Sequence, residues 1–280
     1  MSQQFRFTTQ DEFPHRPDAS VNFNESVYMN AFDASHRMGG WMRLGNRVNE
    51  GYAELSVCLY LPDGRIACQF QRPKITVNDK LEGGGLLYEV SDPTKRVSMR
   101  YHGEVLLLDD ANLLREPEKM FAHATRAPAI VQWNASAASP IHGGEPLSGD
   151  TPTMYGRDFS LGHFNQHIAV EGFIQIGEQH WPLHAHGWRD HSWGPRYWQS
   201  IYWYRLFLAN FGDGRGFMLL KIATPDGRSR KVGVLMVDGK YEDITDLDVI
   251  TDWTPRQDPQ RVRLNVRTAT RAEVIEGEVV

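Results

Sequence analysis

Three observations predict that the chain is mostly β and forms two packed antiparallel barrels or sandwiches. Short apolar or alternating runs occupy most of its 280 residues. Turn residues such as Pro-Asp-Gly and Asp-Gly separate these runs, and almost no stretch keeps the 3.6-residue spacing of an amphipathic helix. Strands of this kind bury one face and protect their edges, which a closed barrel or a pair of sheets achieves. We expect less than about a quarter of the residues to be helical, against a usual share of roughly a third.

Three hairpins are expected where a tight turn joins two apolar runs, because glycine and aspartate adopt the backbone angles that such turns need. The paired runs are residues 53–61 with 65–70, 202–211 with 216–223, and 231–237 with 240–244. The first hairpin places Cys58 and Cys68 symmetrically about its turn, so the two would stand opposite each other within bridging distance. We expect free thiols, since cytosolic cysteines stay reduced. The best helix candidate, 111–127, contains Pro117 and is expected to be a connecting element.

A segment rich in Ala, Ser, Gly and Pro divides the chain. Residues 134–154 read NASAASPIHGGEPLSGDTPTM and include few large apolar side chains, which is typical of a linker or a long surface loop. We therefore expect an N-terminal β domain over residues 1–155 and a C-terminal β domain over residues 156–280. The strings LPDGR at 61–65 and TPDGR at 224–228 recur in similar hairpin contexts, one in each half, and indicate two related units.

Composition and charge exclude several classes of protein. The shares of hydrophobic (41%), charged (23%) and aromatic (11%) residues are those of a globular protein, not of a disordered chain, a collagen or a disulfide-dense miniprotein. With 30 basic against 35 acidic residues and no basic block, nucleic acid is not an expected partner. Residues 1–10 lack the apolar region of a signal peptide, and no run of about 18 apolar residues exists, so we expect a cytoplasmic protein without a membrane span.

Histidine and tryptophan gather in one part of the sequence. Six of the 11 histidines and five of the 8 tryptophans fall between residues 163 and 203. Residues 183–198 read LHAHGWRDHSWGPRYW, and the period of two of a strand would put every second side chain on one face. One face would carry His184, His186, Trp188 and Asp190, and the other Arg189, His191 and Trp193 if the strand continues that far. Upstream, His163 and His167 would share a face with Asn165.

The residues alone leave three interpretations of this cluster open. The pair His184 and His186 could bind a metal, with Asp190 or another histidine completing the set. Alternatively, Asp190 and a histidine form an acid-base pocket, in which tryptophans desolvate the carboxyl group and raise its pKa. In a purely structural interpretation, Asp190 pairs with Arg189 or Arg196 and the tryptophans fill a barrel.

Two stretches carry a resemblance to a known superfamily. GRDFSLGHFNQHIAVEGFI (156–174) followed by HGWRDHSWGPRYWQ (186–199) resembles the second lipocalin-like unit of the carotenoid 1,2-hydratase (hydroxyneurosporene synthase) superfamily. Residues 24–65 resemble the first unit of an uncharacterised bacterial branch, and fungal cyclases that promote Diels-Alder reactions are further relatives. The resemblance covers most of the chain, and its specific part is the Asp-His-x-Trp-Gly string at 190–194.

The resemblance implies two lipocalin-like antiparallel β-barrel or sandwich units with a deep apolar pocket and a cofactor-free reaction. In the hydratases an acid protonates an alkene, aromatic residues shelter the cation, and water captures it. His191 and Trp193 match the functional His-x-Trp pair of that superfamily. The hydratases also use an aspartate downstream, and the nearest candidate, Asp213, lies in a Gly-Asp-Gly turn, so the match does not extend to this residue.

We therefore expect a cofactor-independent lyase or isomerase of the hydratase-dehydratase type, acting by proton transfer on an apolar isoprenoid, steroid or aromatic compound in a β-barrel pocket. Asp190 is the expected acid or base, His191 its partner or relay, and Trp193 an aromatic wall. No metal or cofactor is expected, the partner is a hydrophobic small molecule, and a homodimer is left open. The alternative is a non-catalytic carrier of a hydrophobic small molecule. The expected substrate contacts are Trp188, His186, Tyr202, Tyr204 and His167.

Overall fold

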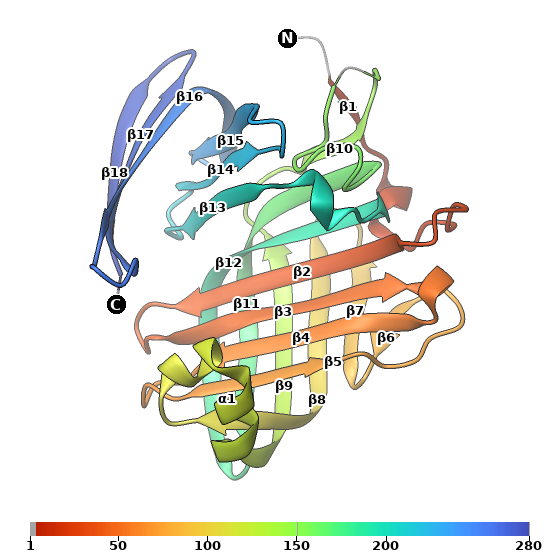
Figure 1. Cartoon of the computed structure of the whole chain (residues 1–280), viewed down its shortest axis with the longest axis vertical. Coiled ribbons are helices and arrows are strands. Elements are labelled where there is room, and N and C mark those ends of the chain that lie inside the picture. The colour runs from red at the N-terminus through yellow and green to blue at the C-terminus, as the bar shows by residue number, and fades with distance from the viewer. Residues whose placement is uncertain (1–3, 150, 280) are drawn as a thin grey trace. The chain divides into compact units, whose positions relative to one another are not determined.

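A computed structural model describes residues 4–149 and 151–279 of the chain (Figure 1). Strands account for 61% of the residues and helices for 8%, so the predictions of a mostly β fold and of a low helix content are confirmed. The chain divides into two compact units, one up to Tyr197 and one from Trp198 onward. In the described part of the chain, no helix is long and apolar enough to cross a membrane.

The first unit contains most of the strands and the one α-helix assigned in the described residues. Its strands are β1 (Phe5–Arg6), β2 (Phe23–Asp33), β3 (Met38–Arg47), β4 (Tyr52–Tyr60), β5 (Ile66–Gln71), β6 (Leu81–Gly83), β7 (Leu86–Asp92), β8 (Arg96–Leu108), β9 (Thr125–Ala137), β10 (His142–Pro146), β11 (Gly162–Ile176) and β12 (Gln179–Pro195). The 3-10 turns η1 (Thr9–Glu12), η2 (Val48–Glu50) and η3 (Ala111–Arg115) and the helix α1 (Pro117–His123) connect them.

Among the described residues, eight strands of the first unit close into a ring. In order these are β2, β3, β4, β5, β8, β9, β11 and β12, each pair is antiparallel, and β12 returns to β2. In Figure 1 the strands β2 to β5 cross the steeper strands β8, β9 and β11. Closure satisfies the backbone groups that open sheet edges would expose, and an eight-stranded ring of this kind is the architecture of lipocalins.

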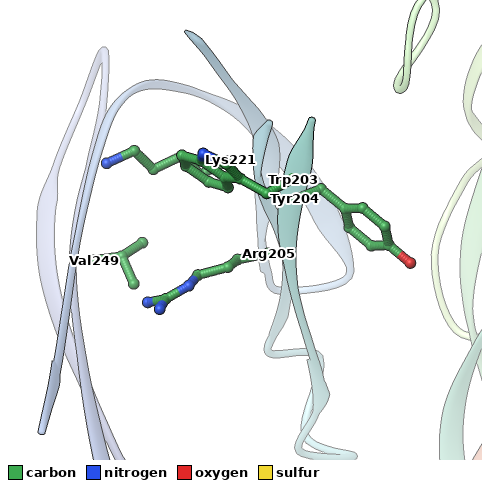
Figure 2. Close-up of a pocket in the computed structure, with 5 residues that line it drawn as sticks. All are labelled: Trp203, Tyr204, Arg205, Lys221 and Val249. Carbon is green, nitrogen blue, oxygen red and sulfur yellow. The ribbon is translucent and has the colours of Figure 1, made fainter. Parts of the chain in front are cut away.

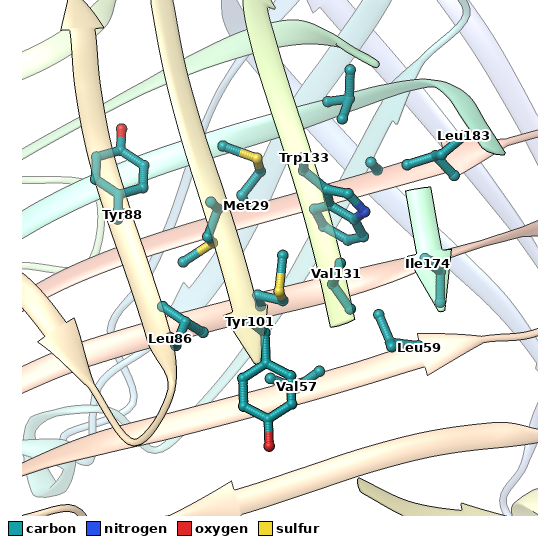
Figure 3. Close-up of a cluster of buried hydrophobic side chains, with 14 of the residues drawn as sticks. Met29, Val57, Leu59, Leu86, Tyr88, Tyr101, Val131, Trp133, Ile174 and Leu183 are labelled. Atoms are coloured by element: carbon teal, nitrogen blue, oxygen red, sulfur yellow. The ribbon is translucent and has the colours of Figure 1, made fainter. Parts of the chain in front are cut away.

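Apolar side chains fill the middle of this ring. Because successive residues of a strand point to opposite faces, inward-facing residues of all eight ring strands contribute to one buried cluster. Figure 3 shows part of it, with Met29 from β2, Val57 and Leu59 from β4, Trp133 from β9 and Leu183 from β12. The polar side chains that the sequence singled out therefore lie beside this cluster or on the outer face of the ring.

A buried ion pair joins the N-terminal segment to the ring interior. The guanidinium of Arg189 on β12 donates to both carboxylate oxygens of Glu12, at 2.7 and 2.8 Å. It also donates to the Tyr88 hydroxyl at 2.9 Å and to Gln166 Oε1 at 2.7 Å. Both charged side chains are at most 1% exposed. Arg189 is therefore engaged by Glu12, and the structural interpretation in which it pairs with Asp190 is wrong.

The second unit is a six-stranded antiparallel sheet in simple chain order. Its strands are β13 (Trp203–Asn210), β14 (Gly216–Ala223), β15 (Ser229–Val237), β16 (Lys240–Trp253), β17 (Pro259–Thr268) and β18 (Ala272–Glu278), preceded by η4 (Trp198–Ser200). One face buries an apolar cluster that includes Phe217, Leu219, Leu247 and Leu264. The second and third expected hairpins are confirmed as β13 with β14 and β15 with β16.

The first expected hairpin is also confirmed, as β4 with β5. Cys58 and Cys68 stand directly opposite each other in its register, and both are buried free thiols as expected. Burial raises the pKa of the Cys58 thiol to about 12 and that of the Cys68 thiol to about 11. The helix candidate 111–127 is a short connecting element, as expected, made of η3 and α1.

The boundary between the compact units differs from the expected division at residue 155. It lies after Tyr197, because β11 and β12 pair with β9 and β2 and so complete the ring of the first unit. The expected linker, 134–154, runs within that unit and forms the end of β9 and all of β10. One of its residues, Asp150, lies outside the described residues.

Replacing Glu12 with glutamine should lower the free energy of unfolding by about 3 to 5 kcal/mol, because the buried guanidinium of Arg189 would lose its carboxylate partner. Urea denaturation measures this loss. The matched control is Glu82→Gln, which removes an exposed partner of Lys80 and should cost less than about 1 kcal/mol. Equal losses for the two variants would contradict the role of the buried pair.

Candidate functional site

Strand β12 separates the expected site residues onto two faces. Its register with β2 runs from His186 to Pro195 without a shift, so its side chains alternate strictly over this stretch. Leu183 and Arg189 point into the ring, where they join the buried cluster and the Glu12 pair. By the same alternation, His191 faces inward and Asp190 faces outward.

Asp190 stands in the middle of a row that crosses four strands on the outer face. In register, it lies opposite Asn165 on β11 and opposite Tyr28 on β2, and Tyr28 in turn lies opposite Arg43 on β3. Side chains directly opposite each other in antiparallel strands have Cβ atoms about 4.5 to 5.5 Å apart. This row therefore brings an acid, an amide, a phenol and a guanidinium together.

The carboxyl group of Asp190 is largely removed from water, with 15% of its side chain exposed. A titratable neighbour is His163, whose Nε2 lies 3.8 Å from Asp190 Oδ2. Burial raises the pKa of Asp190 to about 7, and the positive charges of Arg196 and Arg43 oppose this rise. No arginine nitrogen of the described chain lies within 4.0 Å of this carboxylate. Asp190 can therefore both give and take a proton near neutral pH.

Buried polar atoms without hydrogen-bond partners surround Asp190. Within the described residues, both ring nitrogens of His163, Oδ1 of Asn165, Nε1 of Trp188 and Nε of Arg196 have none. Each such atom costs the folded state about 1 to 3 kcal/mol, and native proteins keep few of them. We call Asp190, His163, Asn165, Trp188 and Arg196 the outer-face site. These donors and acceptors are buried and have no partner within the described chain.

His163 enters this site as a neutral imidazole. Burial and, to a smaller extent, the positive charge of Arg196 lower its pKa to about 3. The ring of Tyr155 stacks on it, with centroids 5.6 Å apart. A neutral imidazole offers one donor and one acceptor, so His163 can orient water or a hydroxyl group beside Asp190.

Arg196 supplies positive charge to the outer-face site. Its Nη2 donates to Ser192 Oγ at 2.8 Å, and its guanidinium carbon lies 4.1 Å from the centroid of the Phe159 ring. Burial lowers its pKa to about 9, which still leaves the guanidinium charged at neutral pH. Because Arg196 bonds to Ser192 and not to Asp190, its charge opposes the rise in the pKa of Asp190 without holding the carboxyl group in a hydrogen bond.

Aromatic rings form a wall next to Asp190 on the outer face. The ring of Tyr28 lies 6.0 Å from that of Trp188 and 6.1 Å from that of Trp41, and Trp41 lies 6.4 Å from Phe70. Trp188 is 2% exposed whereas Phe70 is 44% exposed, so the wall runs from a buried end to an open one. Burial raises the pKa of Tyr28, which keeps its phenol neutral. Such a wall can bind a flat apolar group or face a cation.

A second cluster of polar residues lies on the inner face. His191 Nε2 and His15 Nδ1 lie 2.6 and 2.9 Å from the same oxygen, Oε1 of Glu25. Burial alone would raise the pKa of Glu25, but these two hydrogen bonds lower it to about 2. Trp193 stacks on His15 with ring centroids 3.8 Å apart. The three ligand atoms lie within 4.8 Å of one another, so this cluster could hold a metal ion.

The structure brings together some of the predicted site residues and separates others. Asp190 and Trp188 share the outer face, and buried His167 lies opposite Trp188 on the same face. His191 and Trp193 lie on the inner face, so the predicted pairing of Asp190 with His191 is wrong.

The remaining predicted contacts are more exposed. His186 is exposed on β12, and Tyr202 and Tyr204, at 74% and 43% exposure, belong to the second unit. His184, the other half of the predicted metal pair, is also exposed and bonds through Nδ1 to Glu171 at 2.5 Å.

Sequence reasoning missed several residues of both clusters. Tyr28, Arg43 and Glu25 come from strands that end more than 130 residues before β12 begins, and no local pattern connects them with it. His163 had a usable signal, since the period of two places it on one face with Asn165. Its contact with Asp190 depends on the β11–β12 register.

Comparison with known proteins places the chain among related folds. The family model described as "Domain of unknown function (DUF7064)" matches residues 8–280. No curated protein sequence matches the chain. Among solved structures, an AttH-type protein of Nitrosomonas europaea aligns with a TM-score of 0.59 and 12% identity, over 94% of this chain and 82% of that one.

Two further solved structures have the same fold. Kievitone hydratase of Nectria haematococca aligns with a TM-score of 0.55 and 9% identity, over 94% of this chain and 77% of that one. CghA aligns with a TM-score of 0.53 and 14% identity, over 98% of this chain and 80% of that one. At identities of 9 to 14%, these likenesses show a shared fold.

The pH dependence of stability should report the raised pKa of Asp190. In the folded state this group keeps its proton up to about pH 7, whereas in the unfolded chain it loses it near about pH 4. Between these values the folded state binds more protons, so rising pH should destabilise it by up to about 1.4 kcal/mol per unit. Relative to wild type, Asp190→Asn should therefore become progressively more stable from about pH 4 to about pH 7.

Urea denaturation of wild type and Asp190→Asn at pH values across this window measures the difference. Asp213→Asn, in an exposed turn of the second unit, is the matched control and should show no such trend. A constant difference between wild type and Asp190→Asn would show that Asp190 titrates alike in both states.

Proposed function

The chain belongs to the DUF7064 family, and we propose that it is a cofactor-independent lyase or isomerase of the hydratase or cyclase type, with Asp190 as its acid. One observation carries this proposal. A carboxyl group that no arginine locks lies among buried polar atoms without partners, next to an aromatic wall. A purely structural aspartate would be expected to use its neighbours as hydrogen-bond partners.

Proton transfer from Asp190 is the first step of the proposed reaction. The O–H bond of the carboxyl group breaks, and a C–H bond forms at one carbon of a substrate alkene. Positive charge then develops on the other carbon, and the faces of Trp188 and Tyr28 stabilise it. The resulting carboxylate is stabilised by the nearby charge of Arg196.

Capture of the cation completes the turnover. A water molecule oriented by His163 forms a C–O bond and gives up one proton to the carboxylate of Asp190, which regenerates the acid. In a cyclase, a double bond of the same substrate forms the new C–C bond instead, and the Asp190 carboxylate removes a proton from the cation that results. The reverse sequence eliminates water, with the Asp190 carboxylate as the base. His163 thus assists Asp190 by orienting water, in place of the relay role that the sequence assigned to His191.

The aromatic wall supports the proposed class of substrate. Four aromatic rings, one of them 44% exposed, fit an apolar isoprenoid, steroid or aromatic compound better than a sugar or a nucleotide. The shared fold with kievitone hydratase and with CghA is consistent with this class. The alternative is a carrier of a hydrophobic small molecule, for which the same wall suffices and Asp190 has no chemical role.

Incorporation of solvent deuterium tests the proposal and does not require the product to be identified beforehand. The purified protein is incubated in D2O with a panel of isoprenoid alkenes, steroids and aromatic compounds, together with kievitone, and mass spectrometry detects exchange or hydration. We expect at least one compound to gain deuterium, and Asp190→Asn should lower that rate by about 10² to 10⁴.

Three results separate the candidate functions. Glu171→Gln, which changes an exposed carboxylate on the neighbouring strand, should leave the rate unchanged, as should dialysis against EDTA before the assay. Binding of a panel compound without any incorporation would favour the carrier. A folded Asp190→Asn variant with full turnover would remove Asp190 from the mechanism.

The two histidines should respond differently because they occupy opposite faces of the barrel wall. His163→Gln should lower turnover by about 10², since the variant loses the group that orients water. His191→Gln should instead cost about 1 to 3 kcal/mol of stability through its lost bond to Glu25, with turnover of the folded protein within about threefold of wild type. Thermal unfolding and the deuterium assay on both variants check this. The opposite pattern would place the chemistry on the inner face.

A further inference from the structure

The second unit contains a pocket with two cations at its wall. The pocket has a volume of about 380 Å³ and is lined by Trp203, Tyr204, Arg205, Lys221 and Val249 (Figure 2). In Figure 2 the side chains of Arg205 and Lys221 extend from the sheet to the side on which Val249 lies. This is also the face that buries the apolar cluster of the second unit, which Val249 joins.

We propose that this pocket binds an organic anion, a carboxylate or sulfonate carried by a planar apolar group. Arg205 on β13 and Lys221 on β14 stand directly opposite each other in register. Like charges in that position destabilise a sheet unless something neutralises them. Neither cation has a carboxylate oxygen within 4.0 Å in the described part of the chain.

A third cation in the same row, on the next strand, is neutralised by carboxylates. Lys231 on β15 lies opposite Lys221, and its ammonium lies 2.7 Å from Asp246 and 3.6 Å from Asp248. The row of three cations is thus compensated at the Lys231 end and uncompensated at Arg205 and Lys221. An anionic ligand in the pocket would complete the row.

Aromatic rings hold the two cations and supply the apolar surface. Arg205 donates to Thr251 Oγ1 at 2.9 Å, and its guanidinium carbon lies 4.8 Å from the centroid of the Trp253 ring. The ammonium of Lys221 lies 6.0 Å from the centroid of Trp203. An oriented guanidinium can bind a carboxylate or sulfonate through two hydrogen bonds, and the indole rings can contact a flat apolar body. A bare inorganic anion would contact only the two cations and leave the indole rings without a partner.

Two fluorescent probes with one ring system test the proposal. 8-Anilinonaphthalene-1-sulfonate carries an anion, and N-phenyl-1-naphthylamine has the same anilinonaphthalene rings without it. We expect the sulfonate to bind the wild-type protein more tightly than the amine. The double variant Arg205→Gln/Lys221→Gln should weaken sulfonate binding by about tenfold or more and amine binding by less than about threefold.

Control variants isolate this pocket from the rest of the protein. Lys231→Gln removes the same charge from the same row but leaves the pocket cations in place, so sulfonate affinity should stay within about threefold of wild type. Asp190→Asn should not change it either, which keeps this test independent of the proposed reaction. Thermal unfolding of every variant shows whether it is folded. The single variant Lys221→Thr is a second test of the pocket, because threonine favours the strand conformation and so preserves β14.

Two results would overturn the proposal. One is equal affinity of the two probes for the wild-type protein. The other is a folded double variant that binds the sulfonate as wild type does, since the anion would then occupy another part of the molecule.

Discussion

The pairing of β12 on both sides is the constraint on which the chemistry of the first unit depends. Its backbone is bonded to β11 and to β2, and neither register shifts along the segment that carries Asp190. Because the side-chain period of a strand is two, Arg189 and His191 must face the ring interior while Asp190 faces outward. A slip of one residue would exchange the two sets. It would put a guanidinium beside the aromatic wall and an unpaired carboxylate beside Glu12.

The interior of the ring contributes stability, whereas the outer-face site costs some of it. Inside, a continuous apolar cluster is buried and the charge of Arg189 is fully hydrogen-bonded to its partners. Outside, the buried nitrogens of His163 and the amide oxygen of Asn165 have no partner in the described chain, and burial raises the pKa of Asp190 to about 7. Groups of this kind cost stability, and proteins retain them mainly where they serve a function. The interior offsets that cost.

Local sequence patterns were enough to predict the fold class, whereas the composition of the site depends on the pairing of strands that are distant in sequence. Turn residues and alternation predicted the hairpins, and the period of two placed Asp190 and Trp188 on one face, because both are properties of neighbouring residues. The sequence could not predict that Tyr28 lies opposite Asp190, since closure of the ring brings these strands together. The same limit applies to residues 134–154, whose composition resembles a linker although the segment lies between strands of one barrel. The predicted pairing of Asp190 with His191 is wrong because adjacent residues of a strand point to opposite faces of the sheet.

The charges around Asp190 set its strength as an acid. Burial raises its pKa, and the positive charges of Arg196 and Arg43 limit the rise, so that it comes to about 7. Without these arginines the group would be protonated but a weaker acid, and without burial it would be ionised before any substrate arrived. Once the proton has left, the same cations stabilise the carboxylate. They would also repel a cationic intermediate, and the faces of Trp188 and Tyr28 offset that repulsion. The arrangement therefore suits a reaction in which negative charge forms on the enzyme while positive charge forms on an apolar substrate.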